Sequence, residues 1–375
     1  MRVVIVGGGP AGLYLAYLMK RCAARAEVTV VEQNPPDATF GFGVVFSDRA
    51  LAFLREDDEQ TYAALLPHME SWDDMTLVHR NERVVIEGIG FAAIGRLKLL
   101  QLLQQRARSV GVAPQFGNTV TSLDDFGCAD LIVGADGVNS LVRQTFAREF
   151  GASVTLMNNR FAWFGTSRLF DTLTQTFRHT PIGDFNAHHY RYAPDRSTFI
   201  VETDEATFAR AGFECMDARD ARAMCEKVFA DALAGARLIS NNSIWRRFPQ
   251  VGNEHWYHGK YVLIGDALHT AHFSIGSGTR LAMEDAIALD RALADHGSDV
   301  VAALPAFEAA RRPVVAKLVA GAIASAVWYE NFAGHMALTP LELAMSYVQR
   351  SRRVDIGRLR KLSPKFVERY KRERG

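Results

Sequence analysis

A glycine-rich turn directly after an apolar segment constrains the fold of this chain more than any other feature. Residues 2–6 are short, mostly β-branched and apolar without alternation, which is typical of a parallel strand buried on both faces. Gly7, Gly9 and Gly12 follow in the spacing G-x-G-x-x-G. These glycines allow a tight turn, close approach of a pyrophosphate to the backbone, and close packing of the next helix. The N-terminus therefore predicts the strand–turn–helix unit of a Rossmann-like dinucleotide-binding domain.

The segments after this turn strengthen the prediction. A helix expected over residues 11–20 would direct its free N–H groups at the phosphates. A second strand, residues 28–31, ends at Glu32, where a carboxylate accepts hydrogen bonds from an adenosine ribose and disfavours a 2′-phosphate. The expected cofactor contacts in this region are Gly7, Gly9, Pro10, Ala11, Gly12, Glu32 and Gln33. The glycine spacing alone does not distinguish FAD from NAD.

Two later segments repeat the pattern of an apolar strand followed by a carboxylate. Residues 130–135 run into the turn Asp136-Gly137, whose carboxylate and amides suit the polar linker of a cofactor. Residues 261–264 run into Gly265 and Asp266, at the kind of strand end where open α/β sheets bind ligands. We expect Asp266 to accept hydrogen bonds from ribityl hydroxyls. An Asp-Gly turn is common by itself, so the prediction depends on the combination.

A second glycine loop points to a flavin. Gly276, Gly278 and Thr279 precede a helix expected over residues 280–294. Such a loop presents backbone N–H groups and the positive end of a helix, which stabilise negative charge on a reduced flavin. We expect these three residues to lie at the cofactor.

The fingerprint with Glu32, the Asp-Gly segment and the Gly-Asp segment, in this order and spacing, resemble the single-component FAD monooxygenases that hydroxylate aromatic rings. The resemblance spans residues 1 to about 328. It implies FAD as cofactor, NADH or NADPH and O2 as cosubstrates, and oxygen transfer from a flavin hydroperoxide to an electron-rich ring. It also implies that Arg96 lies beside the FAD at the start of a helix; a solvated helix-start arginine is the alternative.

A narrower resemblance concerns the substrate. Segments 40–48, 164–166, 197–202 and 272–279 are similar to the salicylyl-CoA 5-hydroxylases, the anthraniloyl-CoA monooxygenases and the hydroxylase of violacein biosynthesis. This implies hydroxylation of an aryl-CoA thioester, with salicylyl-CoA to gentisyl-CoA as its sharpest form. A free indolic or phenolic metabolite is the alternative substrate, and a flavin oxidase or dehydrogenase without oxygen insertion is the alternative class. Phe273-Ser274 stands where most ring hydroxylases carry proline.

The predicted fold class is α/β, with a Rossmann-like FAD-binding domain, an inserted antiparallel-sheet substrate domain and a C-terminal helical region. Antiparallel strands are expected over 160–166, 184–192 and 197–203, with a turn at 193–196. The predicted FAD-binding segments are 1–70, 96–155 and 251–300, the substrate-domain segments are 71–95 and 156–250, and the C-terminal helices with their basic tail occupy 301–375.

The strand expected over 186–192 supplies the candidate catalytic residues, His188 and Tyr190. Alternation places both on one face, and the resemblance turns that face toward the flavin. A histidine pKa near neutrality suits a general base, and a histidine satisfied by a backbone carbonyl is the alternative. His272 is ranked lower because it can simply cap the turn before the glycine loop. The expected substrate contacts are Phe42, Phe164, His188, Tyr190, His272 and Phe273.

Composition indicates an ordinary globular protein. Of 375 residues 48% are hydrophobic and 23% charged, enough for a sizeable core. No run of about eighteen apolar residues predicts a membrane span, and a strand beginning at Arg2 leaves no room for a cleavable signal. The cysteines, Cys22, Cys128, Cys215 and Cys225, lack C-x-x-C or zinc spacing. We therefore expect a reduced cytoplasmic protein without a metal site.

Charge is uneven although the net charge is only +1. From Arg350 onward eleven basic residues face three acidic ones, so this tail is +8 and the remainder −7. A solvated terminal helix is the simpler interpretation, and attraction of an anionic substrate such as a CoA thioester is the functional one. A basic patch interleaved with aromatics is absent, so nucleic acid is not an expected partner. The apolar segment 318–328 predicts either a homodimer interface or a core helix.

Overall fold

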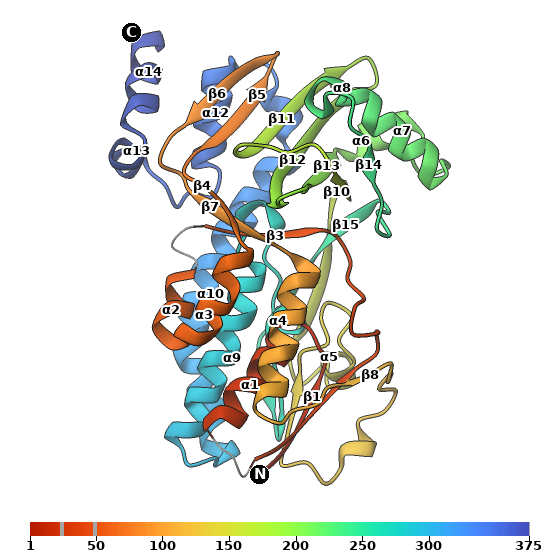
Figure 1. The fold of residues 1–375 in the computed structure, drawn as a ribbon, viewed down its shortest axis with the longest axis vertical. Coiled ribbons are helices and arrows are strands. Elements are labelled where there is room, and N and C mark those ends of the chain that lie inside the picture. Colours follow the sequence, from red (N-terminus) through yellow and green to blue (C-terminus); the bar gives the residue numbers. More distant parts are fainter. Residues whose placement is uncertain (23–25, 48–50, 375) are drawn as a thin grey trace.

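The computed structural model describes residues 1–22, 26–47 and 51–374. Figure 1 shows an elongated molecule with a sheet near the N-terminus at one end and a large, mainly antiparallel sheet at the other. The predicted α/β fold, with its inserted antiparallel sheet and C-terminal helices, is confirmed. The last residue of segment 40–48 and the side chain of Cys22 lie outside the described residues.

The N-terminal sheet is a mostly parallel sheet of six strands. In spatial order they are β16 (Tyr257–His258), β17 (Tyr261–Leu263), β9 (Leu131–Gly134), β1 (Arg2–Val6), β2 (Glu27–Glu32) and β8 (Gln115–Phe116). Only β16 and β17 pair antiparallel. The carboxyl ends of β1, β2, β9 and β17 therefore meet at one edge, where a ligand of an open α/β sheet binds.

Helices cover this sheet and enclose the main hydrophobic core. They are α1 (Pro10–Cys22), α4 (Arg96–Ser109), α5 (Leu141–Thr145), α9 (Gly278–Asp295) and α10 (Val300–Glu330). Helix α1 packs against α9 and α4, and the apolar side chains of all three join the core with β1 and β9. The helices predicted over 11–20 and 280–294 are confirmed, each slightly longer than expected.

The second sheet has eight strands and forms the far end of the molecule. They are β5 (Met75–His79), β6 (Glu82–Ile86), β10 (Ala152–Thr166), β11 (Leu173–Thr180), β12 (Gly183–Ala193), β13 (Arg196–Thr203), β14 (Leu238–Ile239) and β15 (Arg246–Asn253). The hairpin of β12 and β13 turns where predicted. One face packs against α6 (Glu205–Ala211), α7 (Ala218–Val228) and α8 (Ala230–Leu233). The other face turns toward α10 and the C-terminal helices.

A small three-stranded sheet links the two ends. It consists of β3 (Gly43–Ser47), β7 (Phe91–Gly95) and β4 (Glu70–Trp72), with α2 (Ala52–Asp57), α3 (Glu59–Leu65) and the 3-10 turn Leu66–His68 beside it. Helix α4 begins directly at the end of β7, so the first turn of α4 lies between the two large sheets. This sheet was not anticipated from the sequence.

The C-terminal region is helical. After α10 come α11 (Phe332–His335), α12 (Pro340–Gln349), α13 (Ile356–Leu362) and α14 (Pro364–Arg374). By length and composition α10 alone among the described helices could cross a membrane, and 44% of its most apolar stretch is buried inside the protein. Its residues Leu304, Phe307 and Leu318 belong to the main core, as in a core helix. Cys128, Cys215 and Cys225 are free thiols.

Candidate active site

The glycine turn after β1 is shaped by close backbone packing on one side and open space on the other. Gly7 has φ of +109°, and a Cβ there would lie 2.3 Å from the carbonyl oxygen of Ala135. At Gly9, by contrast, apart from Gly9 and its two chain neighbours, no atom of the described residues 1–22, 26–47 and 51–374 comes within 4 Å of the Cβ position. A ligand can therefore reach the backbone of Gly9 at the N-terminus of α1, as the spacing predicts.

Glu32 is fixed beside this turn by backbone donors. Its Oε2 accepts a hydrogen bond from the N–H of Gly8 at 2.7 Å, and its Oε1 accepts one from the N–H of Asn34 at 2.8 Å. The carboxylate thus lies at the carboxyl end of β2, next to the glycine turn and on the predicted ribose side. Gln33, its neighbour in the chain, is exposed.

The Gly265-Asp266 turn lies against the glycine fingerprint although the chain separates them widely. Gly265 has φ of +62°, and a Cβ there would approach the Cβ of Ala11 to 3.1 Å. Asp285 of α9 anchors the turn, because its Oδ2 accepts from the N–H of Gly265 at 3.1 Å. The two glycine motifs therefore form one site.

A buried ion network holds Asp285 in place. His269 Nε2 lies 2.8 Å from Asp285 Oδ2, and Arg311 Nε lies 2.8 Å from Asp285 Oδ1. Burial raises the pKa of Asp285, but His269 and Arg311 offset this and leave that pKa below its ordinary value. The carboxylate is therefore ionised, and it fixes the Gly265 turn to α9.

Asp266 and Arg96 interact electrostatically. The side chain of Asp266 is exposed, yet surrounding protein desolvates it and raises its pKa, while Arg96 acts in the opposite direction. Desolvation likewise lowers the pKa of Arg96, which begins α4. A side chain that is accessible and yet desolvated by the surrounding protein typically lies at a recessed part of the surface.

Asp136 has one oxygen that the protein uses and one that it does not. Oδ2 accepts from the N–H groups of Leu141 at 2.7 Å and Val142 at 3.3 Å, at the start of α5. Oδ1 is buried and lacks a hydrogen-bond partner among the described residues. A buried carboxylate oxygen without a partner is costly unless water or a ligand donates to it.

A cavity of about 190 Å³ opens where the Gly276 loop meets β12 and the C-terminal helices. Its walls are mainly apolar, with Val45, Met75, Phe91, Leu173 and Val348 among them. Gly276 lines it with φ of +59°, and a Cβ there would press on Val45 Cγ1 at 2.9 Å. The polar lining includes His188 and Arg350.

His188 is buried in this cavity as a neutral imidazole. It is 4% exposed, and neither ring nitrogen has a hydrogen-bond partner in the part of the chain that the structure describes. Burial and the nearby Arg350 lower its pKa to about 3. The expectation of a histidine pKa near neutrality is therefore wrong. A neutral ring offers one acceptor and one donor nitrogen instead.

Gln175 of β11 lies opposite His188 of β12 in the strand register. It is fully buried, and neither atom of its amide group finds a hydrogen-bond partner in the described ranges. Because register partners share a face of the sheet, Gln175 and His188 point to the same side. Two unpartnered polar groups therefore lie together beside the cavity.

Arg350 is anchored beside His188. Its guanidinium donates to the carbonyl of Tyr347 at 2.7 Å and to that of Ser274 at 2.6 Å, and it lies 3.7 Å from the ring centroid of Tyr347. Carbonyls and a ring contact the guanidinium without neutralising its charge, and its buried Nε has no hydrogen-bond partner among the described residues. The cavity thus contains a fixed cation next to a neutral histidine.

Comparison with known sequences identifies the family. One family model, an FAD binding domain, matches residues 128–322, and an NAD(P)-binding Rossmann-like domain matches residues 5–36. A salicyloyl-CoA 5-hydroxylase from Streptomyces sp. is 41% identical over 98% of this chain and 73% of its own length. The chain belongs to the FAD-binding monooxygenase family.

Two further relatives agree with this membership. A 3-hydroxy-4-methyl-anthranilyl-(aryl-carrier protein) 5-monooxygenase from Streptosporangium sibiricum is 38% identical over 88% of this chain and 89% of its own length. A protodeoxyviolaceinate monooxygenase from Chromobacterium violaceum is 33% identical over 92% and 94%. The crystallised 2-methyl-3-hydroxypyridine-5-carboxylic acid oxygenase shares the fold, with a TM-score of 0.71 at 21% identity over 94% of this chain and 98% of that one. This monooxygenase is a flavin-dependent aromatic hydroxylase that uses FAD.

The described residues fit FAD. The open side of Gly9 admits a pyrophosphate, Glu32 lies on the ribose side, and the unpartnered Oδ1 of Asp136 awaits a donor. Asp266, which follows Gly265, and Arg96, which begins α4, interact electrostatically and supply a carboxylate and a guanidinium for the cofactor's polar groups. Gly278 and Thr279 form the first turn of α9, so its free N–H groups lie beside that loop.

Two predicted substrate residues of this monooxygenase have structural contacts instead. Phe164 is buried on the opposite face of the sheet, in the cluster with Phe199 that packs under α6 to α8, so its prediction as a pocket residue is wrong. In a strand with apolar residues at every position, the sequence does not show which side chains point to which face of the sheet. The side chain of Phe164 points to the face opposite the cavity. The hydroxyl of Tyr190 donates to the carbonyl of Gly43 at 2.8 Å. Tyr190 thus braces Gly43, the first residue of β3.

His272 and Phe273 lie next to the glycine loop. His272 Nδ1 lies 2.8 Å from the hydroxyl of Ser274 and caps the turn that follows, which is the alternative role considered for it. Burial, with Arg350 and His188, lowers its pKa to about 3. Phe273 packs on Phe161 with ring centroids 4.9 Å apart. Their contact with substrate stays a prediction.

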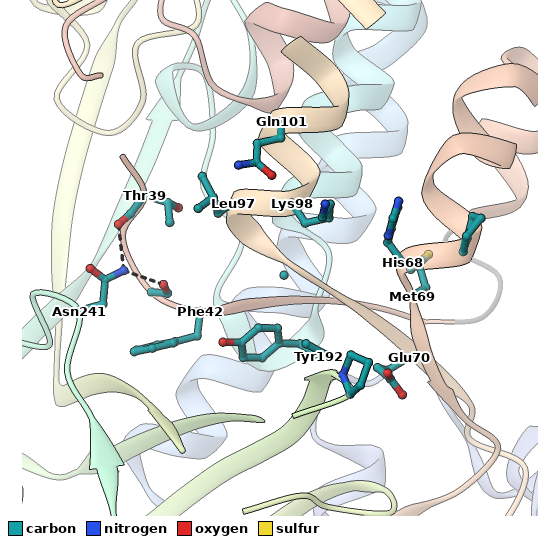
Figure 2. A pocket seen from close by; sticks show the side chains of 15 residues that line it. Thr39, Phe42, His68, Met69, Glu70, Leu97, Lys98, Gln101, Tyr192 and Asn241 are labelled. Carbon is teal, nitrogen blue, oxygen red and sulfur yellow. Dashed lines mark hydrogen bonds between the residues drawn. The ribbon is translucent and has the colours of Figure 1, made fainter. Parts of the chain in front are cut away.

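Phe42 lines a second hollow, of about 480 Å³, beside the first turn of α4. Figure 2 shows Phe42 and Tyr192 along one side of it, with Lys98 and Gln101 of α4 opposite. Asn241 holds the loop before Phe42, since its Nδ2 donates to the carbonyls of Thr39 at 3.0 Å and Gly41 at 3.1 Å. This hollow offers a second approach to the cofactor region from the side of Arg96.

Sequence reasoning missed Gln175, Arg350 and the ion network around Asp285. Gln175 lies between Leu173 and Phe177 at alternating positions of one strand, and a polar residue on that otherwise apolar strand face was the available signal. Arg350 was noted only as part of the basic tail, because nothing local places the end of α12 beside β12. The carboxylate of Asp285 within an otherwise apolar helix face hinted at a buried partner.

Proposed function

We propose that this monooxygenase hydroxylates the ring of an aryl-CoA thioester, with salicyloyl-CoA to gentisyl-CoA as the specific reaction. The observation that carries the proposal is the cavity beside the Gly276 loop, which combines apolar walls with His188 and the fixed cation Arg350, next to the unpartnered amide of Gln175 on the neighbouring strand. Support also comes from two relatives, whose names give a CoA thioester and an aryl-carrier-protein thioester as substrates.

The polar groups of the cavity suit a hydroxylated ring. The neutral imidazole of His188 accepts a hydrogen bond from the phenolic hydroxyl, and the charge of Arg350 favours the ionised phenol. An ionised or hydrogen-bonded phenol has more electron density at its ortho and para positions. Gln175 donates its amide N–H to the carbonyl oxygen of the acyl group. Bound FAD supplies the redox chemistry that activates O2.

The surrounding side chains keep water out. Val45, Met75 and Leu173 line the cavity next to Gly276, and Tyr190 holds the Gly43 carbonyl so that β3 closes its wall. A water-poor site strengthens the interaction of the ring with Arg350 and protects reactive oxygen species from solvent.

We further propose NADH or NADPH as the reductant. The hollow beside α4 supports this, because it lies next to Arg96 and carries Lys98 and His68 as basic side chains for an anionic cosubstrate. In this proposal segments 1–70, 96–155 and 251–300 bind FAD, 71–95 and 156–250 bind substrate, and 301–375 complete the pocket. We propose a cytoplasmic location.

A free indolic metabolite is the second candidate substrate. The 33% identity with the protodeoxyviolaceinate monooxygenase over 92% of this chain favours it. A free metabolite has no phosphates to be recognised outside the cavity. Turnover of a free ring compound at a rate that added CoA does not change would favour this candidate.

Replacement of His188 tests the proposal. We expect His188→Ala to retain FAD but to lose hydroxylation of salicyloyl-CoA by about 100-fold, the usual contribution of a positioned proton-handling group. His179→Ala is the control, because His179 is exposed on the neighbouring strand and pairs with Asp184. Product formation, FAD absorbance and peroxide release are measured in parallel. Full hydroxylation by His188→Ala would contradict the assignment of this cavity.

A further inference from the structure

Three arginines from separate elements surround the mouth of the His188 cavity. Arg280 comes from the first turn of α9, Arg353 from the turn after α12, and Arg358 from α13. We call Arg280, Arg353 and Arg358 the arginine entrance. Arg353 and Arg358 are exposed, so the entrance faces solvent while His188 lies inside.

The entrance carries more positive charge than the protein neutralises. Partial desolvation lowers the pKa of Arg353, and the neighbouring charges of Arg280 and Arg358 lower it further. Within the described ranges neither Arg353 nor Arg358 forms an ion pair, and Arg358 reaches only the carbonyl of Arg353 at 3.4 Å. Arg280 pairs with Glu284 at 2.7 Å. Arg353 and Arg358 lack a counterion in the described ranges and lie close to the charge of Arg280, so they favour an anionic ligand.

Arg369, another basic residue of the same tail, is paired instead. Arg369 of α14 pairs with Glu82 at 2.8 Å and with Glu373 at 3.0 Å. Arg353 and Arg358 differ from Arg369 in two ways: they line the cavity, and they form no ion pair within the described ranges.

The backbone holds Arg353 in position. Its aliphatic stem lies against Gly321 of α10, where a Cβ would approach Arg353 Cδ to 2.7 Å. Arg352, just before it, has φ of +55°, a left-handed conformation that non-glycine residues rarely adopt. Asp355 then caps α13 by accepting from the N–H of Arg358 at 2.7 Å. The entrance is thus built by packing and capping.

The cavity is too small to enclose a complete CoA thioester. Its volume of about 190 Å³ lies below the roughly 300 Å³ at which pockets begin to enclose drug-sized ligands. An aromatic acyl group beside His188 fits this space, and the remainder of a thioester must leave through the mouth. The arginine entrance is what that remainder meets.

We propose that Arg280, Arg353 and Arg358 bind the phosphates of a phosphopantetheine arm whose aromatic acyl group lies in the His188 cavity. The inference rests on the proposed aryl-thioester function and names its recognition site. Guanidinium groups suit it, because they bind phosphate oxygens in a bidentate manner. The arm can belong to free CoA or to a carrier protein, since both present a phosphate beyond the thioester.

The test compares two thioesters of the same acid in the FAD-loaded enzyme. Salicyloyl-CoA carries the phosphates, and the N-acetylcysteamine thioester of salicylate lacks them. We expect Arg353→Gln and Arg358→Gln each to lower the ratio of kcat/KM for salicyloyl-CoA over the truncated thioester by about tenfold, the loss of one charge-assisted hydrogen bond. Gly321→Ala, which displaces the Arg353 stem, is expected to act in the same direction.

Arg360→Gln is the matched control, since Arg360 is exposed on α13 but does not line the cavity. Binding of CoA itself, measured by calorimetry, gives a readout without catalysis, and we expect Arg353→Gln to weaken it about tenfold. An equal ratio and equal CoA affinity in Arg353→Gln, Arg358→Gln and Arg360→Gln would overturn the inference.

The outcomes separate this inference from the proposed function. If all variants hydroxylate salicyloyl-CoA and the kcat/KM ratio of the two thioesters is unchanged, the phosphate-binding role of the arginine entrance is refuted and the proposed function stands. If CoA binding depends on Arg353 but neither thioester is hydroxylated, the proposed function is refuted and the phosphate-binding site stands. Arg353-dependent turnover of a salicyloyl-loaded carrier protein, with no turnover of salicyloyl-CoA, assigns the same phosphate site to a carrier-bound arm.

Discussion

Gln175 and His188 face each other across the β11–β12 pair, and both are buried without a hydrogen-bond partner in the described part of the chain. Buried polar groups are nearly always paired in folded proteins, so two orphans at one point of a sheet need an explanation. The proposed ring substrate, with its hydroxyl and acyl oxygen, would supply partners to both. In this proposal the ring lies between the sheet and the Gly276 loop.

Gln175→Leu removes the amide at similar volume. We expect the fold to be unchanged or stabilised by about 1 kcal/mol, because an unpaired polar group is replaced by an apolar one. Coupling of cofactor oxidation to hydroxylation should fall, with more peroxide for each product formed. Thermal unfolding and the ratio of product to peroxide measure the two effects. Gln144→Leu, at an exposed site of α5, should leave both unchanged.

Gly9→Ala separates cofactor binding from folding. The described protein leaves room for the added methyl group, whereas an approaching pyrophosphate does not. We expect FAD affinity to fall at least about tenfold, a loss of about 1.4 kcal/mol, while the apoprotein unfolds as before. Fluorescence titration with FAD checks this, with Gly334→Ala as a control at an equally open site. Normal FAD affinity in Gly9→Ala would place the pyrophosphate elsewhere.

Asp285→Asn breaks the ion network beneath the Gly265 turn. Removing the charge of Asp285 leaves buried Arg311 with Glu284 alone, and breaking a buried ion pair costs up to about 3–5 kcal/mol. We expect a lower midpoint of urea unfolding and weaker retention of FAD, because Asp285 holds the turn that precedes Asp266. Asp231→Asn, in an exposed pair with Arg178, should shift the midpoint little. A midpoint equal to the wild type would contradict the anchoring role.

The buried histidines predict a stability that falls with acid. His188 and His272 have a pKa of about 3 when folded, against about 6.5 in an unfolded chain. The folded state therefore binds fewer protons, so stability is complete above about pH 6.5 and falls below it by about 1.4 kcal/mol per pH unit for each histidine. The loss continues toward pH 3.

Glu202 has the opposite effect on stability. Burial raises its pKa to about 8, so the folded state holds a proton that the unfolded state releases, and stability increases as the pH falls below 8. The histidine contribution is therefore measured as a difference from wild type. Urea unfolding of His188→Gln and His272→Gln between pH 7.5 and 5 should show a shallower loss than wild type. An identical pH slope in all three proteins would mean that these histidines titrate normally.

The cofactor half of the site could be predicted from the sequence because its residues sit at strand ends. Gly9, Glu32 and Asp266 each follow an apolar strand, and parallel strands bring their carboxyl ends to one edge whatever the intervening chain does. The position of Gly276 could also be predicted, because the conformation of a glycine loop before a helix is set by the local sequence.

The substrate half depends on packing between distant elements, which local sequence does not encode. Phe164 was misplaced because a run of apolar residues hides which face of a strand is inside. Arg350 and Arg353 reach the cavity only because α12 packs beside β5 and α10. Tyr190 lies on the predicted face of the strand, but its hydroxyl already donates a hydrogen bond to the backbone carbonyl of Gly43.

The most direct test of the central claim is the product formed aerobically from salicyloyl-CoA by the FAD-loaded enzyme with NADH or NADPH, analysed by mass alongside peroxide release. The account predicts a thioester one oxygen heavier, and flavin reduction that salicyloyl-CoA accelerates more than free salicylate does. Peroxide as the sole product, with flavin reduction equal for every ligand, would contradict it.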